Sequence, residues 1–251
     1  MPTTRNAHFT HDTFRFLTEL KLHNERAWFL DNKGRYETLV QQPFLAVIAE
    51  LSSTYHSISP FLVSSPKPVG GSMLRVYRDT RFSSNKAPYK TYAAANFFHA
   101  DGKNEPAPGF YLHVEPGHGF FGCGVWHPEP ENRTKIAQAI VQNPDEWIRA
   151  SQARSFTKVW SLSGETMKRV PRGFDPKHKL AGELIRKDFV ATLSFTEPEM
   201  IDPAFVGQLK NAIRKAGPFM KFLTRAVGFQ WDATDEKRRV DPLKGDFSQK
   251  F

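Results

Sequence analysis

The sequence predicts an α+β fold with N-terminal helices, a central antiparallel meander sheet, and C-terminal helices with one further strand. Two observations support this class. Apolar residues recur at helical spacing near both ends of the chain, whereas the middle alternates apolar and polar residues with the period of a strand. The strand-like segments are joined by short Gly- and Pro-containing connections, which favours antiparallel neighbours over parallel strands with crossover helices.

The N-terminal part is predicted to be helical from Thr10 to about Leu51. Phe14 and Leu17 begin a series of apolar residues at helical spacing that continues through this part. Residues 52–71 are rich in Ser, Pro and Gly, which predicts a loop with one short extended piece. This loop separates the helical part of the chain from the β part.

Four strands are expected in the middle of the chain. In the third of them, alternation predicts one apolar face and one polar, aromatic face, which carries Tyr111, His113 and Glu115. The stretch ADGKNEPAPG separates the second and third strands, and EPGHG is a short hairpin connection between the third and fourth, so an antiparallel meander is the simplest arrangement. The four expected strands lie around residues 73–78, 91–99, 109–116 and 119–128.

The C-terminal part is expected to hold helices around one more strand. Residues 129–150 predict a helix, and residues 164–195 predict a basic loop, a short helix and a strand. Residues 202–228 predict an amphipathic helix that is interrupted at Gly217 and Pro218, because proline lacks the backbone N–H that a helix needs.

These elements predict a single domain over residues 10–228, followed by a charged tail over residues 229–251 that we expect to be mobile. The chain of 251 residues is long enough for a sizeable core. Cys123 is its only cysteine, which excludes an intramolecular disulfide and favours a reducing compartment. We found no signal peptide and no long apolar run, so we expect a cytoplasmic protein without a membrane segment.

The charge of the chain favours acidic partners. The formal net charge is +9, and residues 61–100 carry six Lys and Arg side chains against one acid. Nucleic acid, phosphorylated metabolites and anionic lipid are partners of this kind. The densest basic stretch is internal and interleaved with apolar residues, which favours a pocket or groove over a basic terminal tail.

The basic stretch SMLRVYRDTRFSSNKAPYKTY, residues 72–92, is the strongest candidate for a binding site. Guanidinium groups bind phosphate or carboxylate in bidentate fashion and stay charged throughout the physiological pH range. Asp79 is expected to orient one arginine and to leave the other cations for the ligand. The leading prediction is therefore an anionic small molecule, and its expected ligand-binding residues are Arg75, Arg78, Arg81 and Lys86.

Three alternatives to this prediction stay open. The cluster could be a structural Arg–Asp network that holds a hairpin against the N-terminal helices. It could bind the backbone of nucleic acid, or the chain could be an interaction protein without a ligand. The sequence does not decide whether the protein is an enzyme, because the common nucleotide-binding and nucleophile motifs are absent. No cofactor and no oligomeric state are predicted.

Proton transfer, if the protein performs any, would fall to residues in or near this cluster. We take Asp79, Tyr89 and His127 as the catalytic candidates, since a histidine at a strand end beside a basic cluster can act as a general acid or base. No metal site is assigned. Whether His113, Glu115 and His127 bind a metal is left open, because their spacing matches no known signature.

The stretch RVYRDTRFSSNKAPY, residues 75–89, resembles the signature RxxRDxRFxx[DN]KxxY of an uncharacterised, mainly bacterial family named domain of unknown function 2461. Segments such as GFYLHVEPG, GVWHPEP and PFMKFL are similar to other parts of that family. Asn85 stands where many members have Asp, which the pattern permits. The resemblance implies one domain over about residues 10–228, and it implies no activity, cofactor or catalytic residue.

Overall fold

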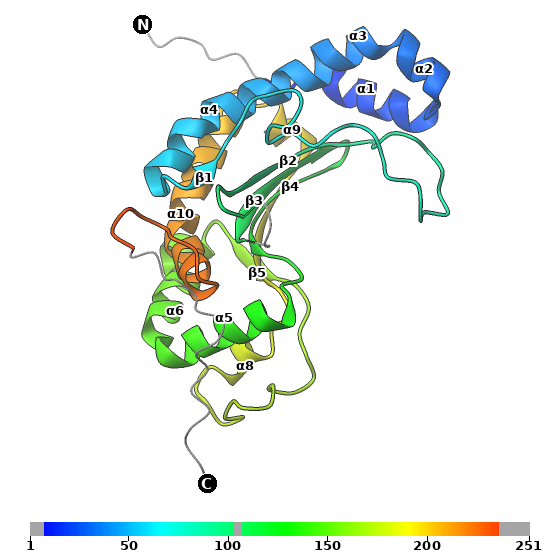
Figure 1. The fold of residues 1–251 in the computed structure, drawn as a ribbon. Coiled ribbons are helices and arrows are strands. Elements are labelled where there is room, and N and C mark those ends of the chain that lie inside the picture. Colours follow the sequence, from blue (N-terminus) through cyan, green and yellow to red (C-terminus); the bar gives the residue numbers. More distant parts are fainter. Residues whose placement is uncertain (1–7, 103–106, 236–251) are drawn as a thin grey trace, which may run out of the picture.

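In the computed structural model, which describes residues 8–102 and 107–235, helices from both ends of the chain pack against a central antiparallel sheet, which confirms the α+β class (Figure 1). The sheet has six strands in the order β1-β2-β3-β4-β6-β5, and every neighbouring pair is antiparallel. The strands are β1 (Leu62–Val63), β2 (Ala93–His99), β3 (Gly109–Glu115), β4 (His118–Val125), β5 (Ser161–Ser163) and β6 (Phe189–Phe195).

The N-terminal helices lie above the sheet in Figure 1, where the first helix is folded back beside the second and third. A single π-helical turn joins the short third helix to the long fourth one, so the chain stays helical through this junction. The elements are α1 (His11–Leu22), α2 (Arg26–Asp31), α3 (Lys33–Tyr36), η1 (Glu37–Gln41) and α4 (Gln42–Ile58).

Within the described residues, six further helices follow the meander, and the longest of them closes the fold. They are α5 (Pro130–Gln142), α6 (Pro144–Ser151), α7 (Arg154–Thr157), α8 (Ala181–Leu184), α9 (Glu197–Met200) and α10 (Phe205–Ala226). Helix α10 packs against α4, α6 and β4, so it joins the two helical parts over one face of the sheet (Figure 1).

The two faces of the sheet differ as the alternation in β3 predicts. Phe110, Leu112 and Val114 are buried against the helices. On the opposite face, Asn96 of β2 and His118 of β4 are exposed. The polar face, which we call the open face, carries Tyr111 and Glu115, which are half-buried, and His113, which is buried beside the rings of Tyr92 and Phe120.

Residues 73–78 do not form the strand expected from the sequence. They make isolated bridges instead, from Met73 to Ala95 and from Tyr77 to Tyr89. The chain leaves the sheet after the first bridge and pairs with its own returning limb, where the Arg78 N–H donates to the Pro88 carbonyl at 2.9 Å. Pairing between the two limbs of one loop therefore replaces the expected pairing of this segment along β2.

Two predicted helix boundaries differ from the structure for reasons of burial and backbone chemistry. Residues 52–58 belong to α4 instead of a loop, because Thr54 and Tyr55 are buried on its inner face. The expected helix over residues 129–150 is divided at Asn143, and Pro144 opens the second part. A proline at the first helical position loses no hydrogen bond, so it starts a helix more readily than it continues one.

Helix α10 runs through Gly217 and Pro218 without the predicted interruption. A proline inside a helix costs about 3 kcal/mol. Phe219, Met220 and Leu223 follow it directly and are fully buried. Each large apolar side chain gains roughly 1.5–3 kcal/mol on burial, so packing of the last two turns outweighs the cost of the proline.

The described part of the predicted tail, residues 229–235, packs against the domain. Trp231 is buried, and its carbonyl oxygen accepts a hydrogen bond of 2.6 Å from the Ser59 hydroxyl. The remainder of the predicted tail, residues 236–251, lies outside the described residues. Among the described helices, none combines the length and the apolar character that crossing a membrane requires.

Candidate functional site

The basic stretch forms a loop, residues 75–92, which we call the cationic loop; it projects beyond the sheet on the side of α1 and α2 (Figure 1). Asn24, between these two helices, fixes it in place. The Asn24 side-chain amide donates to the Tyr89 carbonyl and accepts from the Tyr89 N–H, both at 3.0 Å. The Tyr89 ring stacks on Phe29 at 4.1 Å between centroids. The loop is therefore anchored through Tyr89.

Asn24→Ala is expected to loosen the cationic loop and to lower the free energy of unfolding by about 1–2 kcal/mol, since it removes two hydrogen bonds worth roughly 0.5–1.5 kcal/mol each. Trypsin should then cleave within the loop faster than in the wild type. Asn32→Ala is the matched control, because the Asn32 amide donates to Trp28 within its own helix. Equal cleavage rates in both variants would contradict the anchoring role of Asn24.

A pocket of about 470 Å³ lies where the cationic loop meets α1 and β2. The end of α1 supplies Lys21, the loop supplies Arg78, Asp79 and Lys90, and Tyr92 closes the side next to the sheet. The other lining residues are Asn24, Asn85, Ala87, Tyr89 and Thr91. Three of the residues around this pocket are cations and one is an acid.

The single acid of the pocket is neutralised from outside it. Both carboxylate oxygens of Asp79 bind the Arg81 guanidinium, at 3.0 Å from Nε and 2.7 Å from a terminal nitrogen. This hydrogen bonding lowers the pKa of Asp79 below its ordinary value, so the carboxylate stays ionised and paired. The charge that remains in the pocket is positive.

The three cations that line the pocket differ in their hydrogen-bond and ion-pair partners. Within residues 8–102 and 107–235, the side chains of Lys21 and Arg78 have no hydrogen-bond or ion-pair partner. The Lys90 ammonium donates to the Arg75 carbonyl at 3.0 Å. Burial, with the nearby Arg75 charge, lowers the pKa of Lys90. Two cations of the pocket thus have their full hydrogen-bonding capacity available for a ligand.

The structure separates the predicted ligand-binding residues. Arg78 lines the pocket, whereas Arg75 is exposed outside it. Arg81 also lies outside and reaches the site only through Asp79. The Lys86 ammonium donates to the Thr80 carbonyl at 3.0 Å within the loop. Of the four predicted cations, one therefore faces the pocket directly.

The three catalytic candidates, Asp79, Tyr89 and His127, do not lie together in one site either. Tyr89 is buried against Phe29, and burial raises its pKa, which makes the phenol a poorer proton donor at neutral pH. His127 follows the last residue of β4, whereas Tyr89 precedes the first residue of β2. The strand register places those two positions at opposite ends of the sheet. Asp79 and Tyr89 share the pocket, and His127 lies elsewhere.

His127 is held by a buried carboxylate. Asp188 accepts the His127 backbone N–H at 2.7 Å and lies 3.2 Å from Nδ1 of the same residue. It also accepts the Glu165 N–H at 2.9 Å. His127 has a φ of 48°, a left-handed conformation that is uncommon for residues other than glycine. Asp188 therefore stabilises an unusual turn at the end of β4.

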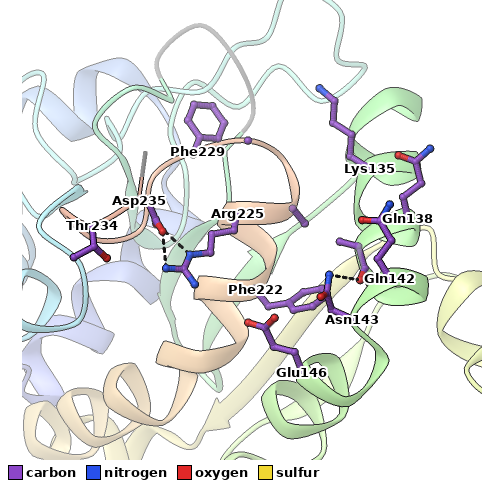
Figure 2. A pocket seen from close by; sticks show the side chains of 13 residues that line it. Lys135, Gln138, Gln142, Asn143, Glu146, Phe222, Arg225, Phe229, Thr234 and Asp235 are labelled. Carbon is purple, nitrogen blue, oxygen red and sulfur yellow. Dashed lines mark hydrogen bonds and ion pairs between the residues drawn. The ribbon is translucent and has the colours of Figure 1, made fainter. Parts of the chain in front are cut away.

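A larger pocket of about 630 Å³ lies between α5, α6 and the end of α10 (Figure 2). Its cations are paired with acids. Arg225 binds Asp235 with 3.1 Å between Nε and Oδ2, and Lys135 lies 2.7 Å from Glu131. Glu146 adds a further carboxylate to the lining. This pocket is therefore less suited to an anion than the pocket at the cationic loop.

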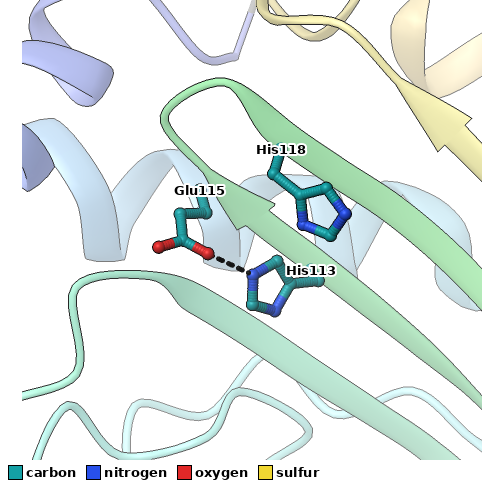
Figure 3. Close-up of side chains that lie close together, drawn as sticks. All are labelled: His113, Glu115 and His118. Atoms are coloured by element: carbon teal, nitrogen blue, oxygen red, sulfur yellow. Dashed lines mark hydrogen bonds and ion pairs between the residues drawn. The ribbon is translucent and has the colours of Figure 1, made fainter.

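The open face of the sheet gathers a second group of polar residues at the tip of the β3–β4 hairpin (Figure 3). Nε2 of His113 lies 3.1 Å from a Glu115 carboxylate oxygen, and Nδ1 lies 3.2 Å from the Tyr111 hydroxyl. His118 pairs directly across the hairpin with Glu115. Tyr92 packs on the His113 ring with 4.4 Å between centroids. Tyr92 thus joins this group to the pocket at the cationic loop.

Sequence reasoning missed several of these residues. Lys21 and Asn24 precede the cationic loop by more than fifty positions, and no local pattern connects them with it. His118 carried a usable signal, because the short turn at Pro116 and Gly117 places it opposite Glu115. The sequence left open whether His113, Glu115 and His127 bind a metal. In the structure, His118 and not His127 lies close to His113 and Glu115.

Comparison with known proteins gives one family. A family model described as a conserved hypothetical protein (DUF2461) matches residues 12–222. The match includes all of α1 except its first residue, the cationic loop and the whole sheet. A search of the curated proteins finds no match.

Proposed function

This chain belongs to the DUF2461 family of conserved hypothetical proteins, and we propose that it binds a phosphate- or carboxylate-bearing small molecule in the pocket at the cationic loop. The proposal rests on which charged side chains of the pocket have a partner and which do not. Asp79 is occupied by Arg81, while Lys21 and Arg78 have no side-chain partner within the described residues. Holding unpaired cations near each other is unfavourable unless an anion neutralises them.

Each cation has a distinct part in the proposed site. Arg78 is the bidentate ligand, since its planar guanidinium can donate two parallel hydrogen bonds to one oxyanion. Lys21 adds a point charge from the end of α1, and Lys90 closes the side next to Tyr92. The proposal is for binding and assigns no reaction, because Asp79 is paired and Tyr89 is buried. We place this binding function in the cytoplasm.

Arg78→Ala is expected to weaken binding of pyrophosphate or succinate at least tenfold, because a hydrogen bond to a charged group contributes about 1.5–3 kcal/mol. Isothermal titration calorimetry measures the affinity, and thermal unfolding measures stability. Stability should stay nearly unchanged or rise, since the substitution removes a repelling charge. Arg75→Ala is the control, because it removes the same charge from outside the pocket lining.

Two outcomes would contradict the anion site. If Arg78→Ala lowers the melting temperature by several degrees and leaves binding intact, the cluster is structural. If Arg75→Ala weakens binding as much as Arg78→Ala, the net charge of the loop matters and the pocket does not. Neither result bears on the α+β fold, which does not depend on the role of these cations.

Nucleic-acid binding is the second candidate function, and exposed aromatic rings on the cationic loop favour it. Phe82 is 96% exposed and Tyr77 is 52% exposed. Rings of this kind, between basic residues, can stack on unpaired bases. Affinity for a single-stranded oligonucleotide should then fall steeply with salt, because each phosphate contact releases counterions. Phe82→Ala should weaken it, whereas pyrophosphate binding should be insensitive to Phe82→Ala.

A further inference from the structure

We propose that His113, Glu115 and His118 form a binding site for one divalent transition-metal ion, and Zn²⁺ is the ion to test first. All three side chains lie on the open face of the sheet at the tip of the β3–β4 hairpin (Figure 3). Two imidazoles and one carboxylate are a ligand set found in catalytic zinc and non-haem iron sites. This inference stands independently of the anion pocket.

The distances suit a metal ion. One potential ligand atom from each residue lies within 4.8 Å of those of the other two, and the His113 and Glu115 atoms are 3.1 Å apart. Zn²⁺ holds nitrogen and oxygen ligands at about 2.0–2.2 Å, which puts tetrahedral ligand atoms about 3.3 Å from each other. His113 and Glu115 thus already have near-ideal separation. Rotation of the exposed His118 side chain can close the remaining gap.

The hairpin register explains why the residues converge. Glu115 and His118 are directly opposite each other across the two-residue turn, and His113 pairs with Phe120 two residues further along each strand. Side chains at such paired and diagonal positions on one face of a sheet lie within reach of each other. The backbone therefore brings the three ligands together before any metal binds.

His113 is also oriented as a metal ligand requires. The Tyr111 hydroxyl lies 3.2 Å from Nδ1, so it can accept the Nδ1 proton while Nε2 faces Glu115 and the proposed ion. Phe120 stacks on the ring at 5.0 Å, and Tyr92 packs on it as well. A hydrogen bond to the outer nitrogen fixes the tautomer and orientation of a ligating imidazole. Tyr111 is therefore the positioning residue.

Three protein ligands would leave a coordination position vacant. His113 is buried and Glu115 is half-buried, whereas His118 is exposed, so that position would be accessible to water or to a small molecule from the side of His118. Imidazole ligands favour Zn²⁺, Fe²⁺, Cu²⁺ or Ni²⁺ over Ca²⁺ and Mg²⁺, which prefer oxygen ligands alone. The site should consequently discriminate against the two alkaline-earth ions.

The test is isothermal titration calorimetry of the untagged, metal-free full chain with Zn²⁺. We expect one ion per chain, and at least tenfold weaker binding in His118→Ala, which changes an exposed side chain and should fold normally. Tyr111→Phe should also weaken binding, by roughly 10–100-fold, because it removes the hydrogen-bond partner that orients the His113 ring. His56→Ala is the control, since His56 is exposed on α4 and distant in sequence from the hairpin. Mg²⁺ should not compete.

Cobalt provides an independent readout. Co²⁺ bound at a site of this kind should give visible absorption bands that report its coordination, and His118→Ala should abolish them. The proposal is overturned if the wild type takes up less than one Zn²⁺ per chain at micromolar concentrations. It is also overturned if His118→Ala binds Zn²⁺ as tightly as His56→Ala does.

Discussion

Asp188→Ala is expected to lower the free energy of unfolding by about 2–6 kcal/mol, because it leaves two backbone N–H groups without an acceptor and each costs roughly 1–3 kcal/mol. The Asp188 side chain is 1% exposed and accepts the N–H groups of His127 and Glu165. It therefore holds the turn after β4 to the segment before β6. For a chain of this length the melting temperature falls by roughly 2–4 °C per kcal/mol.

Two further substitutions separate the backbone role of Asp188 from its contact with the His127 ring. Asp188→Asn keeps one acceptor oxygen and should cost about half as much. His127→Ala removes only the imidazole, which is 55% exposed, and should cost less than about 1 kcal/mol. Equal losses for His127→Ala and Asp188→Ala in urea unfolding would show that the ring contact dominates. The small expected effect of His127→Ala also makes it usable in any later test of proton transfer.

The open face of the sheet shows which features the sequence predicts well. Strand alternation is local, so Tyr111, His113 and Glu115 could be placed on one face before the structure was known. The addition of His118 depends on the register across the hairpin, which follows from the turn that joins the strands. One further step of local reasoning would therefore have completed the proposed metal site.

The pocket at the cationic loop shows why the rest could not be predicted. Arg78 and Arg81 look equivalent in the sequence, yet Arg81 is bound to Asp79 and Arg78 is available. That difference depends on the conformation of an irregular loop, for which there is no periodic pattern. Lys21 and Asn24 reach the pocket only because helix packing brings α1 beside the loop. Long-range contacts of this kind are determined by the whole fold.

Gly124→Ala should destabilise the sheet by about 3 kcal/mol or more. Gly124 lies in β4 with a φ of 120°, a conformation that L side chains rarely adopt. A Cβ atom there would overlap the carbonyl oxygen of Phe189 on the neighbouring strand β6. Backbone strain of this type costs about 1–3 kcal/mol, and the forced displacement of β6 adds a similar amount. Urea unfolding measures the loss, provided that the variant is soluble.

Gly122→Ala is the matched control, because it makes the same substitution on the same face of β4. Its Cβ would meet no atom closer than 3.9 Å, the nearest being carbonyl oxygens of Ala191 and Tyr111. Ala is better tolerated than Gly within a strand by roughly 0.5–1 kcal/mol, so Gly122→Ala should leave stability unchanged or raise it slightly. If both variants lose equal stability, crowding of the open face is responsible instead of the Gly124 backbone conformation. A selective loss in Gly124→Ala would show that close approach of β4 and β6 requires glycine at this position.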